Sequence, residues 1–351
     1  MHDCQSVHPV AVPGTDVGAS RYCRRVSSNR LSIALQFSAL GLLWGASFLF
    51  MKVALGGVSF GQVAWTRLVL GALTLGLVML VLRTKLPREP IVYLHFVVIG
   101  AFGCAIPYLL FAWAEQYVTS GLASIYNAVT PITTALMVTL VFRVEKLDRS
   151  RVLGVVAGIL GVIVIIGPWS FVASEAAHGD LLLELAGQLA CIGSAVCYGF
   201  TFGYIRRFIS NRHPVSGLTA AFLQVGMGAA ILLVLTPFVA LGPISLDLPI
   251  VLSLVLLGVL GTGLAYYWYM NILNAWGPTA TSTVTYLTPV VGVALGILLL
   301  GETLSWNAPV GAVIVFAGIL LAQGRLRLPH RRGPGSGRVA RDAEKAAAEA
   351  G

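Results

Sequence analysis

The chain has 351 residues, of which 57% are hydrophobic and only 11% are charged. Soluble domains carry about 25% charged residues, so this composition excludes an ordinary water-soluble protein and indicates a chain that lies in a lipid bilayer. The formal net charge of +9 can accompany nucleic-acid binding, but the positions of the basic residues, given below, explain it without a nucleic-acid partner.

Ten apolar segments follow one another along the chain. A membrane-spanning helix needs about 17–25 such residues, and segments of this length occur at 33–55, 60–82, 91–113, 121–142, 152–171, 185–205, 216–241, 250–273, 279–300 and 306–323. We therefore predict an all-α polytopic membrane protein with ten transmembrane helices. The polar ends, 1–30 and 326–351, are predicted to be a disordered basic arm and a disordered basic tail.

The basic residues alternate with the predicted spans. All but two of the 23 Lys and Arg residues fall in the terminal segments or in the loops after the second, fourth and sixth spans. Cytoplasmic loops are enriched in Lys and Arg, so we predict a multi-pass plasma-membrane protein with both termini in the cytoplasm. The loops assigned to the other side carry acids instead, namely Glu115, Glu175, Asp180, Glu184, Asp247 and Glu302.

Two common signatures of catalysis and cofactor binding are absent from the sequence. It contains neither a G-x-x-x-x-G-K-[ST] phosphate loop nor an H-E-x-x-H zinc motif. The five cysteines fall in the N-terminal arm and in predicted spans, a pattern that does not indicate a disulfide framework. We predict no catalytic residue, no cofactor and no bound metal.

An internal repeat relates the two halves of the sequence. A shift of 158 residues places Thr130-Pro131 on Thr288-Pro289, and a shift of 157 places 58–72 on 215–229. Matches of this kind extend over most of both halves, so we interpret the chain as two copies of one five-span unit.

The odd number of spans in each copy determines how the copies are oriented. After five spans the second copy enters the membrane from the opposite face, so we predict two inverted five-helix repeats, 31–171 and 172–325. Many secondary transporters use inverted repeats to build a substrate site near the membrane midplane.

Two prolines, Pro131 and Pro289, lie about halfway along the fourth span of each copy. Each removes a helical hydrogen bond and displaces the carbonyl four residues earlier, at Asn127 and at Thr285. Interrupted helices at matching positions in two repeats point to a substrate site. The alternative is a simple kink, in which a neighbouring Ser or Thr bonds the displaced carbonyl.

Aromatic and amide residues in the predicted spans are candidates for lining a substrate path, because rings can stack on a ligand while hydroxyls and amides orient it. With the two prolines and their carbonyl partners, the candidates are Trp44, Ser47, Tyr108, Tyr126, Tyr198, Tyr266, Asn271 and Tyr286. Trp and Tyr also anchor helices at membrane interfaces. That interpretation, or simple packing, suits Trp113, Tyr117, Tyr269 and Trp276.

Lys52 and Arg67 are the only cations inside predicted spans. Lys52 lies near a span end, where its side chain can reach the interface. Arg67 lies about 10 Å deep at helical rise, where a charge is a functional hypothesis and where its fork suits a carboxylate or phosphate. The alternative is that Arg67 bonds displaced backbone carbonyls. The sequence shows no acid near the middle of a span, so it does not indicate a proton relay.

The chain resembles the EamA-type drug/metabolite transporter superfamily over about 33–323. The resemblance is carried by the stretches LLWGASFLFMKVAL, VAWTRLVLGAL and GLASIYNAVTPITTALMVTLVFRVEKL and by the repeat-related stretches of the second half. The resemblance implies a ten-helix inverted-repeat transporter of small metabolites with a central cavity. The family's Gly-Glu pair is matched by Gly301-Glu302, whereas the first half has Arg143-Val144-Glu145. A symmetric role for the two glutamates therefore does not follow from the resemblance.

The function predicted from these observations is secondary transport of a small-molecule solute, an amino acid or a related metabolite, by alternating access and with efflux as the expected direction. The bilayer is the other predicted partner, and the sequence is compatible with a homodimer. Two alternatives stay open. A membrane enzyme acting on lipid-like substrates would need nucleophiles or carboxylates clustered at one depth, and a non-transporting scaffold would carry no solute.

Overall fold

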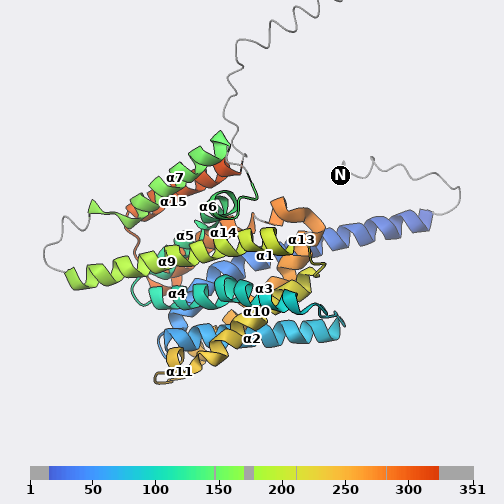
Figure 1. The fold of residues 1–351 in the computed structure, drawn as a ribbon, viewed down its shortest axis with the longest axis horizontal. Coiled ribbons are helices and arrows are strands. Elements are labelled where there is room, and N and C mark those ends of the chain that lie inside the picture. The colour runs from blue at the N-terminus through green and yellow to red at the C-terminus, as the bar shows by residue number, and fades with distance from the viewer. Residues whose placement is uncertain (1–15, 146–147, 170–177, 211, 282, 324–351) are drawn as a thin grey trace, which may run out of the picture.

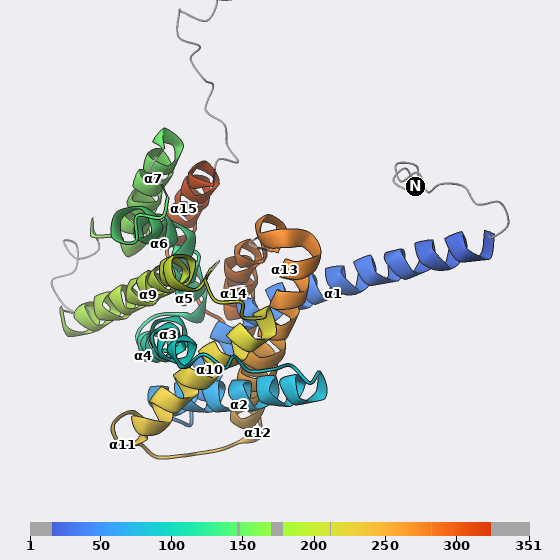
Figure 2. The same cartoon turned by 45° about the vertical axis from the view of Figure 1, so that its right-hand side comes forward.

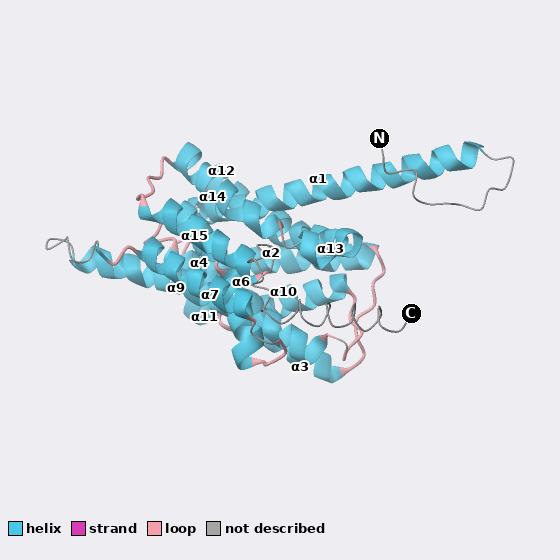
Figure 3. Cartoon of the chain, turned by 90° about the horizontal axis from the view of Figure 1, so that it is seen from above, coloured by secondary structure: helices cyan, strands magenta, loops and turns pink. Residues whose placement is uncertain are grey.

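The computed structural model describes residues 16–145, 148–169, 178–210, 212–281 and 283–323, and every regular element within these ranges is a helix (Figures 1 and 3). The first half contains α1 (Asp16–Ala54), α2 (Phe60–Val81), α3 (Pro90–Gly100), η1 (Ala101–Ala105), α4 (Ile106–Ala114), α5 (Ser120–Asn127), α6 (Thr130–Leu136), η2 (Met137–Val141) and α7 (Arg149–Ile166). The label η denotes π-helical turns, which have wider spacing between hydrogen-bonded residues.

The second half has the same kind of helices in a similar order. It contains α9 (His178–Tyr204), η3 (Ile205–Ile209), α10 (Gly217–Val234), α11 (Thr236–Val239), α12 (Leu248–Val255), η4 (Leu256–Leu264), α13 (Ala265–Thr281), α14 (Val284–Leu300) and α15 (Asn307–Ala322). In α13, the backbone of Gly277 has a φ of 78° and separates the last residues from the helix before it.

The predicted apolar segments are all present as helices. Eight are long and apolar enough to cross a membrane, and two shorter apolar helices, Val284–Leu300 and Asn307–Ala322, correspond to the ninth and tenth segments. One prediction is wrong at the N-terminus, because α1 begins at Asp16, so residues 16–30 of the arm predicted to be disordered are helical. The rest of that arm and the predicted C-terminal tail lie outside the described residues.

The two prolines have different effects on their helices. In the first half the helix ends at Asn127 and begins again at Thr130, so the interruption predicted at Pro131 is confirmed. In the second half α14 continues through Pro289, so the matching interruption predicted there is wrong.

The repeat-equivalent helices α2 and α10 both begin after a serine cap. Ser59 Oγ accepts a hydrogen bond from the Gln62 amide at 3.3 Å before α2, and Ser216 Oγ accepts one from the Thr219 amide at 3.2 Å before α10. Such N-caps satisfy backbone donors that the first turn leaves unpaired. The spacing of Gly57, Ser59 and Gly61 also matches a G-x-S-x-G nucleophile motif, but Ser59 is a helix cap here.

Helices α7 and α15 pack closely together through glycines, and Figures 1 and 2 show them side by side at one edge of the bundle. A Cβ added to Gly154 would lie 2.5 Å from the carbonyl oxygen of Gly318, and one added to Gly161 would lie 2.9 Å from that of Gly311. An early residue of one helix thus opposes a late residue of the other, so the two helices run antiparallel. Small residues permit such close backbone contact inside membranes.

The other helix contacts come in exchangeable pairs. The contact of α1 with α14 corresponds to that of α9 with α6. The contact of α2 with η4 corresponds to that of α10 with α3, and the contact of α4 with α9 corresponds to that of α13 with α1. Each pair becomes its counterpart when first-half and second-half helices are exchanged. The contact pattern therefore follows the sequence repeat.

Candidate functional site

The candidate site is a polar and aromatic cluster where α2, α9, α10, η1–α4 and η4–α13 meet. We call it the central cluster and define it by Arg67, Cys104, Tyr108, Tyr198, Gln224, Thr262 and Tyr266. Cys104 lies in η1 and Thr262 in η4, so both lie on π-helical turns at repeat-equivalent positions. Such turns frequently occur at functional sites, because they redirect backbone and side chains.

Arg67 connects the two halves. Its Nε donates a hydrogen bond to Thr262 Oγ1 at 3.0 Å, and its guanidinium carbon lies 4.0 Å from the centre of the Tyr108 ring. The residue is only 8% exposed. The ion pairs among the described residues join Glu145 to Arg151 and Arg206 and Glu89 to His213, so no described carboxylate pairs with this buried cation. An arrangement of this kind suits an anionic ligand.

Gln224 occupies the position equivalent to Arg67 in the second half. Its Nε2 lies 3.3 Å from Tyr266 Oη and 3.7 Å from Cys104 Sγ. Arg67 contacts Tyr108 of its own half and Thr262 of the other, while Gln224 contacts the matching Tyr266 and Cys104. Cys104 and Thr262 are 158 residues apart, and so are the two tyrosines. The same pair of contacts therefore occurs twice, once with a cation and once with an amide.

Glycines allow this close approach. A Cβ added to Gly71 would lie 2.6 Å from Thr262 Cγ2, and one added to the equivalent Gly228 would lie 2.9 Å from Cys104 Cβ. Tyr198 of α9 packs against the apolar residues around Tyr108 and stacks on Phe111 with ring centres 6.3 Å apart.

Of the residues predicted from the sequence, Arg67, Tyr108, Tyr198 and Tyr266 come together in the central cluster. Ser47 lies next to it, because a Cβ added to Gly261 of η4 would approach Ser47 Oγ to 3.1 Å. The remaining candidates lie elsewhere.

Trp44 and Asn271 lie between α1 and α13. The Trp44 ring is 5.6 Å from that of Tyr269, and Asn271 Nδ2 donates to Gln36 Oε1 at 3.2 Å. Near them is an open hollow of about 390 Å³. It is lined by Leu31, Ser32, Leu35, Gln36, Ala39 and Trp268.

Tyr126 and Tyr286 are bonded to other helices. Tyr126 is fully buried, and its hydroxyl donates to Gln188 Oε1 at 2.8 Å. The Tyr286 hydroxyl donates to Gln323 Oε1 at 2.6 Å, which ties α14 to the end of α15. Neither contact joins the central cluster.

The interruption at Pro131 is locally satisfied. Thr130 Oγ1 donates to the Asn127 carbonyl at 2.7 Å, the kind of local bond that the simple-kink interpretation anticipates. In the second half Pro289 is buried, Thr285 precedes it in α14, and the buried Thr288 hydroxyl has no hydrogen-bond partner among the described residues. Thr288 is equivalent to Thr130 by sequence, so the equivalent hydroxyls differ in hydrogen bonding between the two halves.

One end of the bundle is closed by Glu302, and we call it the Glu302 end. The Glu302 carboxylate accepts hydrogen bonds from the Ser120 amide at 2.8 Å, the Gly121 amide at 3.0 Å and Ser120 Oγ at 3.0 Å. A carboxylate at a helix N-terminus is stabilised by the free amides and by the helix dipole. This second-half residue thus caps α5 of the first half.

The same end contains two ionisable residues whose surroundings the sequence did not reveal. Lys52 Nζ donates to the backbone carbonyls of Glu115 and of Val118, the latter at 3.0 Å, so it is held by the turn after α4. Glu115 is fully buried, and neither of its carboxylate oxygens has a hydrogen-bond partner among the described residues. Burial raises the pKa of this carboxyl well above its usual range, and the nearby Lys52 charge opposes the rise only in part.

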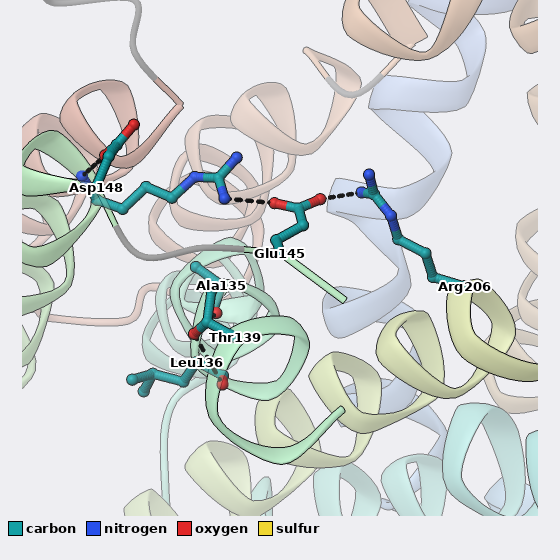
Figure 4. Close-up of polar contacts among 7 residues, drawn as sticks. Ala135, Leu136, Thr139, Glu145, Asp148 and Arg206 are labelled. Carbon is teal, nitrogen blue, oxygen red and sulfur yellow. Dashed lines mark hydrogen bonds and ion pairs between the residues drawn. The ribbon is translucent and has the colours of Figure 1, made fainter. Parts of the chain in front are cut away.

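The opposite end, which we call the Glu145 end, is organised differently. Glu145, equivalent to Glu302 by the repeat, lies between two arginines (Figure 4). It pairs with Arg151 of α7 at 2.6 Å and with Arg206 of η3. The two glutamates therefore do not have the same partners in this structure.

Comparison with known proteins accounts for this architecture. A family model described as the EamA-like transporter family matches the chain twice, over 31–167 and 185–323. The chain belongs to the EamA-like transporter family. It is therefore a multi-pass membrane transporter with two EamA repeats, and the resemblance noted in the sequence is confirmed.

Individual relatives of this family member are distant but similar over most of their length. An uncharacterized transporter of Archaeoglobus fulgidus is 26% identical over 282 residues, which cover 79% of this chain and 94% of the relative. A probable amino-acid metabolite efflux pump of Salmonella typhimurium is 25% identical, covering 80% and 91%. One solved crystal structure shares the fold, with a TM-score of 0.56 and 20% identity over 84% of this chain and 98% of that one.

Proposed function

We propose that the protein is a secondary transporter that exports amino acids or related small metabolites across the plasma membrane by alternating access around a midplane cavity. The central cluster carries this proposal. An arginine in the membrane interior without a described carboxylate partner is costly, and a bidentate bond to a solute carboxylate would offset that cost. The Salmonella typhimurium relative is named as a probable amino-acid metabolite efflux pump, which agrees with this class of solute.

We further propose that ten spans form two inverted repeats. Helices α7 and α15 are equivalent by sequence, yet they run antiparallel, as an inverted duplication requires. The contacts of Arg67 and Gln224 and the exchangeable helix pairs support the same symmetry. The distribution of Lys and Arg supports placing both termini in the cytoplasm, with the Glu145 end inside and the Glu302 end outside.

Alternating access needs a symmetric scaffold that can adopt two unsymmetric states. Here Glu302 caps a first-half helix, while its equivalent Glu145 is bound to arginines instead. The structure therefore has different connections at its two ends, as one state of an alternating-access cycle would have. In the other state we expect the Glu302 cap to be broken.

The direct test is solute exchange in proteoliposomes that contain the purified protein. Vesicles preloaded with unlabelled amino acids should accumulate the matching labelled amino acid by counterflow, with saturable kinetics. Arg67→Ala and Asn127→Ala should both lower this uptake, because the first removes the guanidinium and the second removes the side-chain amide next to the interruption before Pro131. If no amino acid in the full set exchanges faster than in empty vesicles, the proposed solute class is wrong.

A further inference from the structure

The turn between α4 and α5 holds a carboxyl group with an unusual environment. Glu115 follows the last residue of α4, and its side chain is completely buried. Neither carboxylate oxygen has a hydrogen-bond partner among the described residues. Burying an ionised carboxylate without partners costs so much that such a group binds a proton instead.

The groups around Glu115 do not neutralise it by direct pairing. The charged and titratable side chains that face it are Lys52 of α1, Arg67 of α2, Cys191 of α9 and Glu302 of the loop before α15. Lys52 is the nearest candidate partner, but its ammonium bonds backbone carbonyls of the same turn. Glu302, a like charge, opposes ionisation of Glu115.

The turn that contains Glu115 is bonded to two other parts of the chain. On one side, Lys52 holds the turn through the carbonyls of Glu115 and Val118. On the other side, Glu302 holds the first amides of α5, at Ser120 and Gly121. If these connections open, the turn leaves its packed position and water reaches the carboxyl group.

We propose that Glu115 is a proton-binding site, and that closing the Glu302 end takes up one proton onto this carboxyl group. The proposal deepens the proposed function, since it rests on the opening of that end during alternating access. The linkage has a definite sign. An exposed glutamate has a pKa of about 4.3, and the closed end raises that pKa. Above pH 4.3, closure therefore becomes less favourable by up to about tenfold per pH unit, until the pH reaches the pKa of the closed state.

The first experiment detects the proton. Infrared spectra of the protein at pH 7 in an alkyl maltoside detergent, which has no ester carbonyl, should contain the carbonyl-stretch band of a neutral carboxyl group, and the band should be lost in Glu115→Gln. Glu145→Gln is the matched control, because Glu145 pairs with two arginines, and this variant should keep the band. Absence of the band in the wild type, or its persistence in Glu115→Gln, would overturn the proposal. If the variant does not fold, a wild-type spectrum at pH 7 without the band still overturns the proposal.

The second experiment detects the linkage to closure. Hydrogen–deuterium exchange of residues 115–121, corrected for intrinsic pH dependence, should be faster at pH 9 than at pH 6 in the wild type. Glu115→Gln stays neutral at both pH values, so its corrected exchange should be the same. A neutral carboxyl group without this difference would show that Glu115 does not control the end. Both readouts need no solute, so they stay informative if amino-acid transport is disproved.

Discussion

Arg67 is the residue whose chemistry most directly constrains the solute. It is buried, stacks on Tyr108 and donates one hydrogen bond across the repeat interface. A guanidinium has five N–H donors in a planar fork, so a carboxylate can be bound on its remaining side. The equivalent Gln224 is neutral, so the two halves would contribute different groups to the same ligand.

We expect Arg67→Ala to lower amino-acid exchange by at least about tenfold, because removing one member of a buried charged contact costs about 2 kcal/mol or more. Arg67→Lys should also be impaired, since lysine keeps the charge but loses the fork and the ring stacking. Initial rates of labelled uptake measure both effects. Arg88→Ala, in an exposed loop, is the control that should transport normally, and wild-type rates in Arg67→Ala would exclude the residue from the site.

A substitution of Glu302 measures how much its cap on α5 stabilises the Glu302 end. Glu302→Gln keeps the size of the side chain but removes the charge that accepts bonds from two amides and a hydroxyl. We expect a loss of about 1–3 kcal/mol from this contact, seen as a lower melting temperature in detergent. Glu89→Gln, whose side chain is 56% exposed, should melt like the wild type. An unchanged melting temperature in Glu302→Gln would mean that the cap does not stabilise the structure.

Several residues of the central cluster could be predicted from the sequence and others could not. Arg67 and the repeat-related Tyr108 and Tyr266 stand out because polar groups in apolar spans are rare. Gln224 and Thr262 were not predicted, although the 157- and 158-residue shifts align them with Arg67 and Cys104. That alignment was the signal that could have found them.

The environment of Glu115 could not be read from hydropathy at all. A glutamate at the end of an apolar segment looks like an interfacial residue, and Lys52 looks like its counterpart at the end of another segment. In the structure Glu115 is buried, and Lys52 and Glu302 bond the same turn from different parts of the chain. Such a contact is a tertiary property without a local sequence pattern.

At the scale of elements, the apolar segments were predictable because every span must bury an apolar surface in lipid. The break at Pro131 was also predictable, since proline removes a backbone donor. The continuity of α14 through Pro289 was not predictable, because the same Thr-Pro pair lies at an interrupted helix in the first half and inside a continuous helix in the second.

The glycine contact of α7 and α15 gives a prediction at this scale. Gly161→Leu should strongly destabilise the protein, because a Cβ there would lie 2.8 Å from the Val315 backbone nitrogen and 2.9 Å from the Gly311 carbonyl oxygen. The expected result is a lower melting temperature and a lower yield of monodisperse protein. Leu160→Ala is the matched control, because Leu160 is 54% exposed on the outer surface of α7. Equal stability of the two variants would contradict the observed packing.

At the scale of the whole molecule, the two related halves make matching contacts in the central cluster. The Glu302 end and the Glu145 end of the bundle are held by different contacts. The symmetry comes from the sequence repeat, and the difference comes from Glu302 and Glu145. Glu302 caps α5 of the other half, whereas Glu145 is held by Arg151 and Arg206. The proposed alternating-access cycle requires the Glu302 cap to break once in each cycle.

A crosslink across the Glu302 end tests this central claim most directly. A Cβ added to Gly121 of α5 would lie 3.4 Å from the Val293 Cα atom of α14, which suits a disulfide between Gly121→Cys and Val293→Cys. The oxidised double variant should not exchange solute, its reduction should restore exchange, and each single variant should transport under both conditions. Exchange at the wild-type rate by the fully oxidised double variant would contradict the account, because the end would then not need to open.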